Sequence, residues 1–269
     1  MSKFNIHPSA IVEPGAIVSE SVLVGPFSII ESGAQIEDGS SIDSHCVVRR
    51  GSKIGKYCKI DSFSVIGGDP QFLGFIQSTN SGVIIGDNTV LREGVTVHRS
   101  CYKEKNTIVG EKCLLMANSH VAHDCQIGDS VVLANAVLLA GHVFVGDKTF
   151  IGGGAAVHQF ARIGAGVMVG GLTVITKDVA PYCMVTGRNA INGLNLIGLK
   201  RSGIDRSTIK QLKEAFRYVF SSTNTKALAQ DYWKHLEKSN LHDAIIDFLS
   251  FFNSGERGFA TFISRKESH

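Results

Sequence analysis

Residues 6–66 read IHPSAIVEPGAIVSESVLVGPFSIIESGAQIEDGSSIDSHCVVRRGSKIGKYCKIDSFSVI. Every sixth position of this stretch, from Ile6 to Ile66, is isoleucine or valine. The same spacing returns after residue 84, and from Val109 to Ile175 it runs through the chain without a break. A fixed internal period determines the architecture of a chain, so we interpret the rest of the sequence from it.

Two further columns accompany the apolar one: a small side chain four residues after most anchors, and often a glycine directly after them. A period of six fits neither a helical turn nor the alternation of a flat strand. It fits a chain that turns a corner every six residues, with three faces per 18-residue coil and parallel strands about 4.8 Å apart. The predicted fold is mainly β, the left-handed parallel β-helix typical of hexapeptide repeats. The left-handed sense of the coil is taken from that resemblance, because the general rule for parallel crossovers would predict a right-handed one.

The repeat is interrupted twice, at about residues 67–84 and 98–108. Both segments contain polar residues out of phase with the period, so we expect loops extruded from the β-helix. Solenoids tolerate such insertions on their outer faces, where binding sites are often built. With these two loops included, the β-helix is predicted to occupy residues 1–190.

The C-terminal part follows a different pattern. Residues 176–203 are expected to be irregular, because the repeat stops and glycines are frequent. Asp205 is suited to cap a helix, and apolar residues at helical spacing follow it. Two more helices are predicted at about residues 225–237 and 241–252. Residues 191–269 are therefore predicted to form a small α-helical C-terminal domain.

Composition argues against several classes of function. Lys and Arg total 27 against 24 Asp and Glu, a net charge of +3 without a basic run, so neither nucleic-acid nor anionic-membrane binding is expected. We find no membrane-spanning apolar run and no signal-peptide core, and we expect a cytoplasmic protein. The six cysteines include no Cys-x-x-Cys pair. Four occupy the small-residue column, which favours buried thiols over disulfides or zinc ligands.

The coil length also predicts which side chains lie above one another, because residues 18 apart occupy the same position on successive coils. Three histidines are expected to rise up one side of the prism: His123, His142 and His158. Gly141 is expected directly above His123, and Gln159 directly above Gly141.

This arrangement suggests acid–base chemistry. Histidine titrates near neutral pH, so His123 is the candidate general base, with Asp124 holding the ring tautomer. A backbone N–H at Gly141 would stabilise an oxyanion. The alternatives are corner histidines without a shared role, or a metal site. We predict no metal and no cofactor, because stacked side chains project roughly parallel rather than converging.

Several segments carry a resemblance to a known family. They are residues 118–125 (NSHVAHDC), 139–143 (LAGHV), 156–160 (AVHQF), 168–171 (MVGG) and 193–201 (GLNLIGLKR). Together they resemble the UDP-N-acetylglucosamine O-acyltransferases that begin lipid A synthesis, over essentially the whole chain. The hexapeptide repeat is shared by many acyltransferases, whereas the His-Gln-Phe and Asn-x-x-Gly-Leu-Lys-Arg segments are far more specific.

The resemblance implies a cytoplasmic homotrimer with active sites between subunits. It implies transfer of an (R)-3-hydroxyacyl chain from acyl carrier protein to the 3-OH of the UDP-sugar, with basic residues meeting the acidic carrier. His123 would be the general base, oriented by Asp124, with Gly141 as oxyanion donor. The residues implied to bind substrate are Gln71, His120, His142, His158, Gln159, Gly171 at the position limiting acyl length, and Asn195 and Arg201 at nucleotide-binding positions.

The sequence departs from the family pattern at four positions. Phe72 and Gly74 replace an acid and a lysine expected near the sugar, while Ile197 and Ser202 replace a glutamate and an arginine near the nucleotide. The acceptor therefore stays open between the usual sugar nucleotide, bound more weakly, and a modified one, such as a 3-amino UDP-sugar that would be N-acylated. A non-catalytic trimeric β-helix scaffold is the remaining alternative, against which the intact histidine segments argue.

Overall fold

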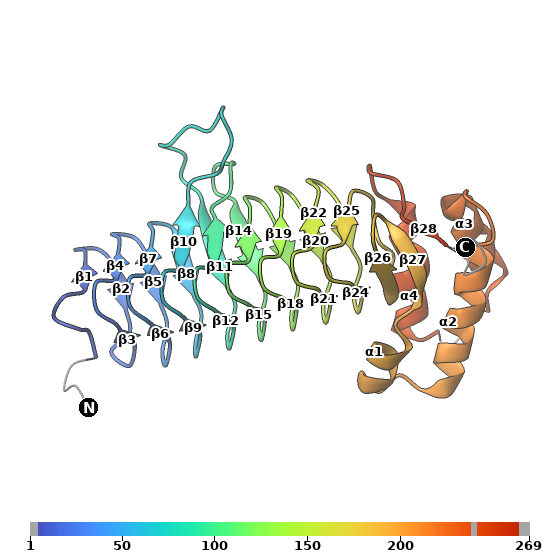
Figure 1. The fold of residues 1–269 in the computed structure, drawn as a ribbon, viewed down its shortest axis with the longest axis horizontal. Coiled ribbons are helices and arrows are strands. Elements are labelled where there is room, and N and C mark those ends of the chain that lie inside the picture. The colour runs from blue at the N-terminus through green and yellow to red at the C-terminus, as the bar shows by residue number, and fades with distance from the viewer. Residues whose placement is uncertain (1–4, 238–240, 264–269) are drawn as a thin grey trace.

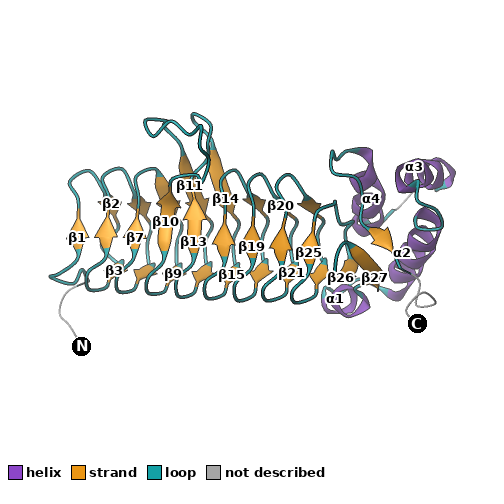
Figure 2. Ribbon diagram, turned by 45° about the horizontal axis from the view of Figure 1, so that its top comes forward, coloured by secondary structure: helices purple, strands orange, loops and turns teal. Residues whose placement is uncertain are grey.

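The protein, described over residues 5–237 and 241–263 by a computed structural model, coils into a triangular prism of three sheets whose strands are mostly parallel (Figures 1 and 2). The first sheet contains β1 (Ile11–Val12), β4 (Ile29–Ile30), β7 (Val47–Val48), β10 (Val65–Gly68), β13 (Thr96–His98), β16 (His120–Val121), β19 (Leu138–Leu139), β22 (Ala156–Val157) and β25 (Val174–Ile175). The second contains β2 (Ile17–Val18), β5 (Gln35–Ile36), β8 (Ser52–Ile54), β11 (Gly82–Ile85), β14 (Asn106–Val109), β17 (Gln126–Ile127), β20 (Phe144–Val145) and β23 (Arg162–Ile163). The third contains β3 (Leu23–Val24), β6 (Ser41–Ile42), β9 (Lys59–Ile60), β12 (Val90–Leu91), β15 (Leu114–Leu115), β18 (Val132–Leu133), β21 (Phe150–Ile151), β24 (Met168–Val169), β26 (Cys183–Thr186), β27 (Ala190–Leu194) and β28 (Thr261–Phe262).

The register confirms the 18-residue coil. Val121 pairs with Leu139, and Leu139 pairs with Val157, so the inward anchors of successive coils stack along the prism axis. All three are buried. The small corner residues also join neighbouring coils, because the Ser40 hydroxyl donates to the Gly55 carbonyl at 2.7 Å and accepts from the next coil's backbone N–H at 2.9 Å. The predicted left-handed parallel β-helix is therefore correct.

Both loops leave the same edge of the prism, the edge between the first and second sheets, which we call the site edge (Figures 1 and 2). Its corners include residues 122–125, 140–143 and 158–161. The loops are shorter than predicted, at 69–81 and 99–105, because β10, β11, β13 and β14 extend beyond the repeat. The strands are longer because their backbones pair beyond the repeat. β11 and β14 pair over four residues, beginning with Gly82 opposite Asn106.

Arg99 ties the two loops together at their base. Its side chain is 2% exposed, and its guanidinium donates to Asp69 at 2.8 Å, to the Thr79 carbonyl at 2.6 Å and to the Gln77 carbonyl at 2.8 Å. It also lies over the Phe75 ring, 4.8 Å from the centroid. A buried charge is stable when it is paired and hydrogen-bonded in this way. One side chain therefore holds the 69–81 loop above the site edge.

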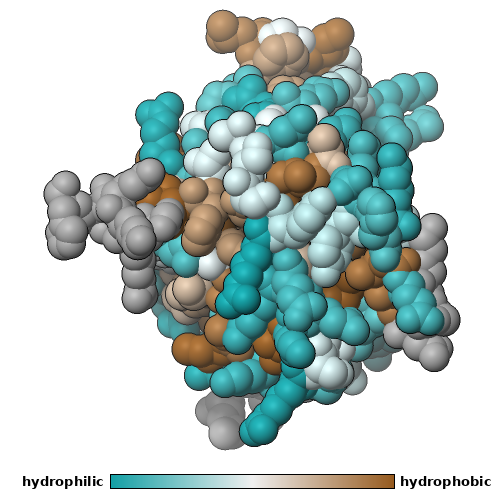
Figure 3. All heavy atoms as spheres, turned by 90° about the vertical axis from the view of Figure 1, so that its right-hand side faces the viewer, coloured by the Kyte–Doolittle hydropathy of each residue, from teal (hydrophilic) through white to brown (hydrophobic). Residues whose placement is uncertain are grey.

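The C-terminal helices close one end of the prism (Figure 1). They are α1 (Leu196–Arg201), α2 (Arg206–Val219), α3 (Thr225–His235), α4 (Asp243–Ser250) and the 3-10 turn η1 (Phe251–Asn253). Asp205 caps α2 as predicted, accepting from the Ser207 and Thr208 backbones at 2.8 and 3.0 Å. Figure 3 shows this end as mostly hydrophilic with separate apolar patches, and solenoids need such a polar cap to remain soluble.

Residues 176–203 are not irregular as expected. They contain β26 and β27, which pair antiparallel, and then α1. The period missed β26 because it pairs Val169 with Val185, an offset of 16 rather than 18, so the last coil falls out of phase. The second and third predicted helices are shorter in the structure, and residues 238–240 and 264–269 of the predicted C-terminal domain lie outside the described residues. A division of the chain at residue 190 stays a prediction, because the third sheet continues across it.

Because the apolar anchors point inward, the two neighbouring leucines of β19 should contribute differently to stability. Leu139 is fully buried, whereas Leu138 is 51% exposed. Leu139→Ala should lower the free energy of unfolding by about 2–5 kcal/mol, because it leaves a cavity in the core. Leu138→Ala, the matched control, should lower it by less than about 1 kcal/mol. Urea denaturation of both variants measures the difference, and equal losses would contradict the inward column.

A second prediction concerns His98, whose Nδ1 is buried without a hydrogen-bond partner among the described residues. Burial, aided by nearby His120 and His123, lowers its pKa from 6.5 to about 4. Between these values the unfolded chain binds a proton that the folded chain does not, so stability falls as pH falls from 6.5 toward 4, by up to about 3 kcal/mol. When the pH is lowered from about 7 to about 4.5, the melting temperature of His98→Gln should fall by less than that of wild type. An equal loss in both proteins would refute this assignment.

Candidate active site

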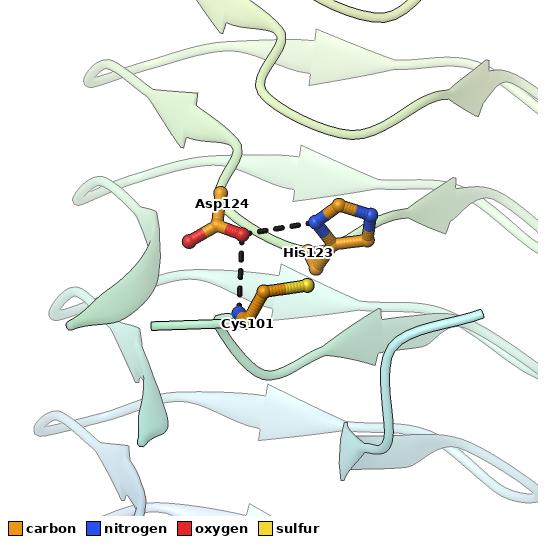
Figure 4. Close-up of side chains that lie close together, drawn as sticks. All are labelled: Cys101, His123 and Asp124. Carbon is orange, nitrogen blue, oxygen red and sulfur yellow. Dashed lines mark hydrogen bonds and ion pairs between the residues drawn. The ribbon is translucent and has the colours of Figure 1, made fainter. Parts of the chain in front are cut away.

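His123 and Asp124 form a hydrogen-bonded pair at the corner that follows β16. The His123 Nδ1 lies 2.9 Å from Asp124 Oδ2, and the two side chains are 17% and 9% exposed (Figure 4). Asp124 has φ of 61°, which turns its side chain out of the coil and toward the loop 99–105. The corner thus presents a partly accessible imidazole backed by a carboxylate.

Asp124 is fixed from several directions. It accepts hydrogen bonds from the Ser100 hydroxyl and from the Cys101 backbone N–H at 3.1 Å, while its own N–H donates to Thr107 at 2.8 Å. Burial opposes ionisation, but the hydrogen bonds from Ser100, His123 and Cys101 outweigh it and lower the pKa of the carboxyl. Asp124 is therefore an ionised acceptor, and the His123 nitrogen that faces it carries the proton.

The next coil supplies the surroundings of this pair. The His142 ring lies edge-on to His123, 5.1 Å away, and stacks on Phe160 at 4.4 Å, while its Nε2 is 3.9 Å from Asp124 Oδ2. Burial lowers the pKa of His142, which favours the neutral ring. A Cβ at Gly141 would fall 2.6 Å from His123 Cε1 and 2.7 Å from Nε2. Only glycine leaves room for this imidazole.

A second histidine pair joins β16 to β13 of the preceding coil. His120 Nδ1 lies 2.7 Å from the Thr96 hydroxyl, and its ring meets His98 edge-to-face at 4.7 Å. Burial and the nearby His123 lower the pKa of His120. A row of neutral imidazoles therefore leads along the site edge to His123.

His158 and Gln159 lie further along the same edge and are exposed. The His158 Nδ1 is 2.5 Å from the Arg257 guanidinium, which belongs to the C-terminal part of the chain. The same nitrogen lies 3.1 Å from the Gln159 carbonyl. Gln71 lies on the exposed loop 69–81 above this edge.

Two of the remaining predicted residues lie at the other two edges. Gly171 follows β24, on the edge between the third and first sheets. Asn195 lies against the corner between the second and third sheets, where its amide donates to the Gly166 carbonyl at 3.0 Å and accepts from the Gly198 N–H at 2.9 Å. Arg201 ends α1 and is exposed. One chain thus separates these three residues from His123.

Sequence reasoning missed three residues that support the site. Ser100 and Thr107, which hold Asp124, lie within the segment predicted as a loop, 98–108, and Arg257, which contacts His158, lies in the C-terminal part. The sequence did hold a signal for Ser100, because this residue lies in the second interruption of the repeat, and that segment forms a loop at the site edge. For Arg257 there was none, because 99 residues separate it from His158.

Comparisons with known proteins agree with this geometry. A family model described as UDP-N-acetylglucosamine O-acyltransferase, domain 2, matches residues 178–260, and the bacterial transferase hexapeptide model matches residues 33–68 and 106–141. The acyl-(acyl-carrier-protein)–UDP-N-acetylglucosamine O-acyltransferase of Sinorhizobium medicae is 45% identical, over 86% of this chain and 88% of that protein. The Anaeromyxobacter protein with this description is 42% identical, over 94% and 98%.

Solved structures show the same similarity. The UDP-N-acetylglucosamine O-acyltransferase of Moraxella catarrhalis matches with a TM-score of 0.88 at 36% identity, covering 96% of this chain and all of that one. The Arabidopsis UDP-N-acetylglucosamine acyltransferase matches with a TM-score of 0.83 at 32% identity, over 95% and 100%. With relatives this similar over nearly its whole length, the chain belongs to the acyl-(acyl-carrier-protein)–UDP-N-acetylglucosamine O-acyltransferase family.

Proposed function

We propose that this chain transfers an (R)-3-hydroxyacyl group from acyl carrier protein to the 3-OH of UDP-N-acetylglucosamine, the first step of lipid A biosynthesis. The observation that supports it most directly is the His123–Asp124 pair beneath Gly141, in a chain of this family. The pair has the geometry of a general base with an orienting carboxylate. The relatives' names supply the donor and the acceptor.

The tautomer of His123 decides which of its two ring nitrogens can accept a proton. Because His123 Nδ1–H donates to Asp124, the lone pair on Nε2 is free to take a proton. It takes the proton of the sugar 3-OH as that oxygen attacks the thioester carbonyl, and Asp124 stabilises the imidazolium that forms. The tetrahedral intermediate then collapses, the ester forms, and the carrier's thiolate leaves with the proton from His123. No covalent acyl-enzyme is needed.

The backbone N–H of Gly141 is the candidate oxyanion donor. In the part of the chain that the structure describes, it makes no hydrogen bond, and it lies beside the His123 ring. The corresponding N–H groups at corner residues Ala117 and Asn135 are equally unbonded. What distinguishes Gly141 is therefore its position next to the base. Preorganised donors of this kind are worth about 10²–10³ in rate.

A trimer would bring the dispersed residues together. Gly171, Asn195 and Arg201 lie away from the site edge in one chain, so a site containing them and His123 needs neighbouring copies. In a three-fold assembly of parallel prisms, the site edge of one copy faces another edge of the next. For the carrier protein, α2 offers exposed Lys210, Lys213 and Arg217 on one face, a basic surface that suits an acidic partner.

The acceptor has a second candidate, a 3-amino UDP-sugar that would receive the acyl group on nitrogen. Its support is the loop tip: Phe72 and Leu73 are exposed apolar residues, and Gly74 follows them. Neither a carboxylate nor an ammonium group stands at positions 72 and 74 to grip a sugar hydroxyl. An uncharged tip suits an acceptor that needs less activation, because an amine is the stronger nucleophile.

Transfer measured with both sugars tests the reaction. With 3-hydroxyacyl carrier proteins of several chain lengths, wild type should acylate UDP-N-acetylglucosamine, and His123→Ala should be about 10²–10⁴-fold slower, because it lacks the base. His235→Ala, which changes an exposed histidine of α3, should keep full activity. Transfer to the 3-amino analogue alone would identify that acceptor instead. If folded wild type acylates neither sugar, the non-catalytic scaffold becomes the favoured interpretation.

Gly141→Ala tests the space above the base. Its Cβ would collide with the His123 ring, so transfer should fall at least tenfold while folding is retained. Gly153→Ala is the matched control, at the equivalent corner position of the edge between the third and first sheets, where the nearest atom to a Cβ is 3.4 Å away. Equal kcat for Gly141→Ala and wild type would show that this contact does not position His123.

A further inference from the structure

Cys101 brings a thiol to the proposed general base. Its Sγ, a ring nitrogen of His123 and a carboxylate oxygen of Asp124 all lie within 4.8 Å of one another (Figure 4). The three side chains come from two elements, the loop 99–105 and the corner after β16. The other five cysteines are buried in the core, whereas Cys101 is partly exposed. The expected parallel projection of stacked histidines does not apply here, because the thiol enters from the loop.

The donor set suits a borderline-soft divalent cation. Thiolate, imidazole and carboxylate are the zinc ligands of proteins, at about 2.3, 2.0 and 2.0–2.2 Å. Donor atoms on one such ion lie about 3–4 Å apart, so small side-chain rotations are sufficient. One thiolate and one carboxylate also balance a charge of +2. His142 Nε2, 3.9 Å from Asp124 Oδ2, stands where a fourth ligand would approach.

Without a metal the thiol is protonated. Burial and the neighbouring Asp124 raise the pKa of Cys101 to about 11. This argues against Cys101 as a nucleophile, since the thiolate is the reactive form. It does not prevent metal binding, because a coordinated thiol loses its proton to solvent and the ion's charge replaces it.

We propose that Cys101, His123 and Asp124 form a Zn²⁺ site whose occupation switches off acyl transfer. This inhibitory consequence rests on the proposed function of His123. Zinc on Nδ1 displaces the hydrogen bond to Asp124, and the neutral imidazole then carries its one proton on Nε2. The nitrogen that should accept the proton of the sugar hydroxyl has no free lone pair, so the base is lost. The thiol proton is released on binding.

Metal binding and activity are measured separately on the full-length protein. After chelator treatment, Co²⁺ is added as a spectroscopic probe, and wild type should show thiolate-to-metal absorption that Zn²⁺ abolishes. Cys101→Ser should lack this absorption, while the Cys101 backbone contact with Asp124 is kept. His235→Asn, at a surface pair with Asp231, is the control and should bind Co²⁺ like wild type.

The transfer assay gives the second readout. Zinc should inhibit wild type, and Cys101→Ser should need at least tenfold more Zn²⁺ to lose half of its own metal-free activity. No Co²⁺–thiolate absorption, or equal zinc sensitivity in both proteins, would overturn the site. If zinc binds through Cys101 but neither UDP-sugar is acylated by metal-free wild type, the proposed function fails and the metal site stands. If transfer is normal and zinc binds without inhibiting it, the claim of base blockade fails.

Discussion

The parallel ladder that holds each coil 18 residues above the last is the constraint on which the structure depends. The inward anchor of each face is buried on its neighbour, as for Val121, Leu139 and Val157, and a slip by one residue would expose the whole column. Because the register is fixed in this way, the position of each corner residue along the prism axis is fixed as well. His123, Gly141 and Gln159 are stacked because the core beneath them is stacked.

Corners give this fold its chemistry. A corner residue with φ near 60°, such as Asp124, His142 or Phe160, projects its side chain outward at the same point of each coil. Outward side chains at one edge therefore form columns whose members contact one another, as His142 contacts both His123 and Phe160. The solenoid converts a sequence spacing into a surface array, and loops extruded from the same edge enclose it.

The orientation of His123 depends on an acceptor that cannot turn. Asp124 is held by Ser100 and by the Cys101 backbone, both from the loop 99–105, and that loop is joined to its neighbour through the buried Arg99. The same closeness places the Cys101 thiol beside the imidazole. A loop that preorganises a base thus also assembles a set of metal donors, because both functions need polar groups that converge on one point.

The sequence by itself determined the period, hence the β-helix, its core column, the presence of two extruded loops and the stacking of Gly141 over His123. These follow from short-range spacing, because in a solenoid each residue's neighbours lie a fixed number of positions away. The sequence missed β26, whose coil is two residues short, and the support of the site by Ser100, Thr107 and Arg257. Such contacts join loops and the C-terminal part to the prism across variable distances in the chain. Only the tertiary structure decided them, because no period relates the residues that it brings together.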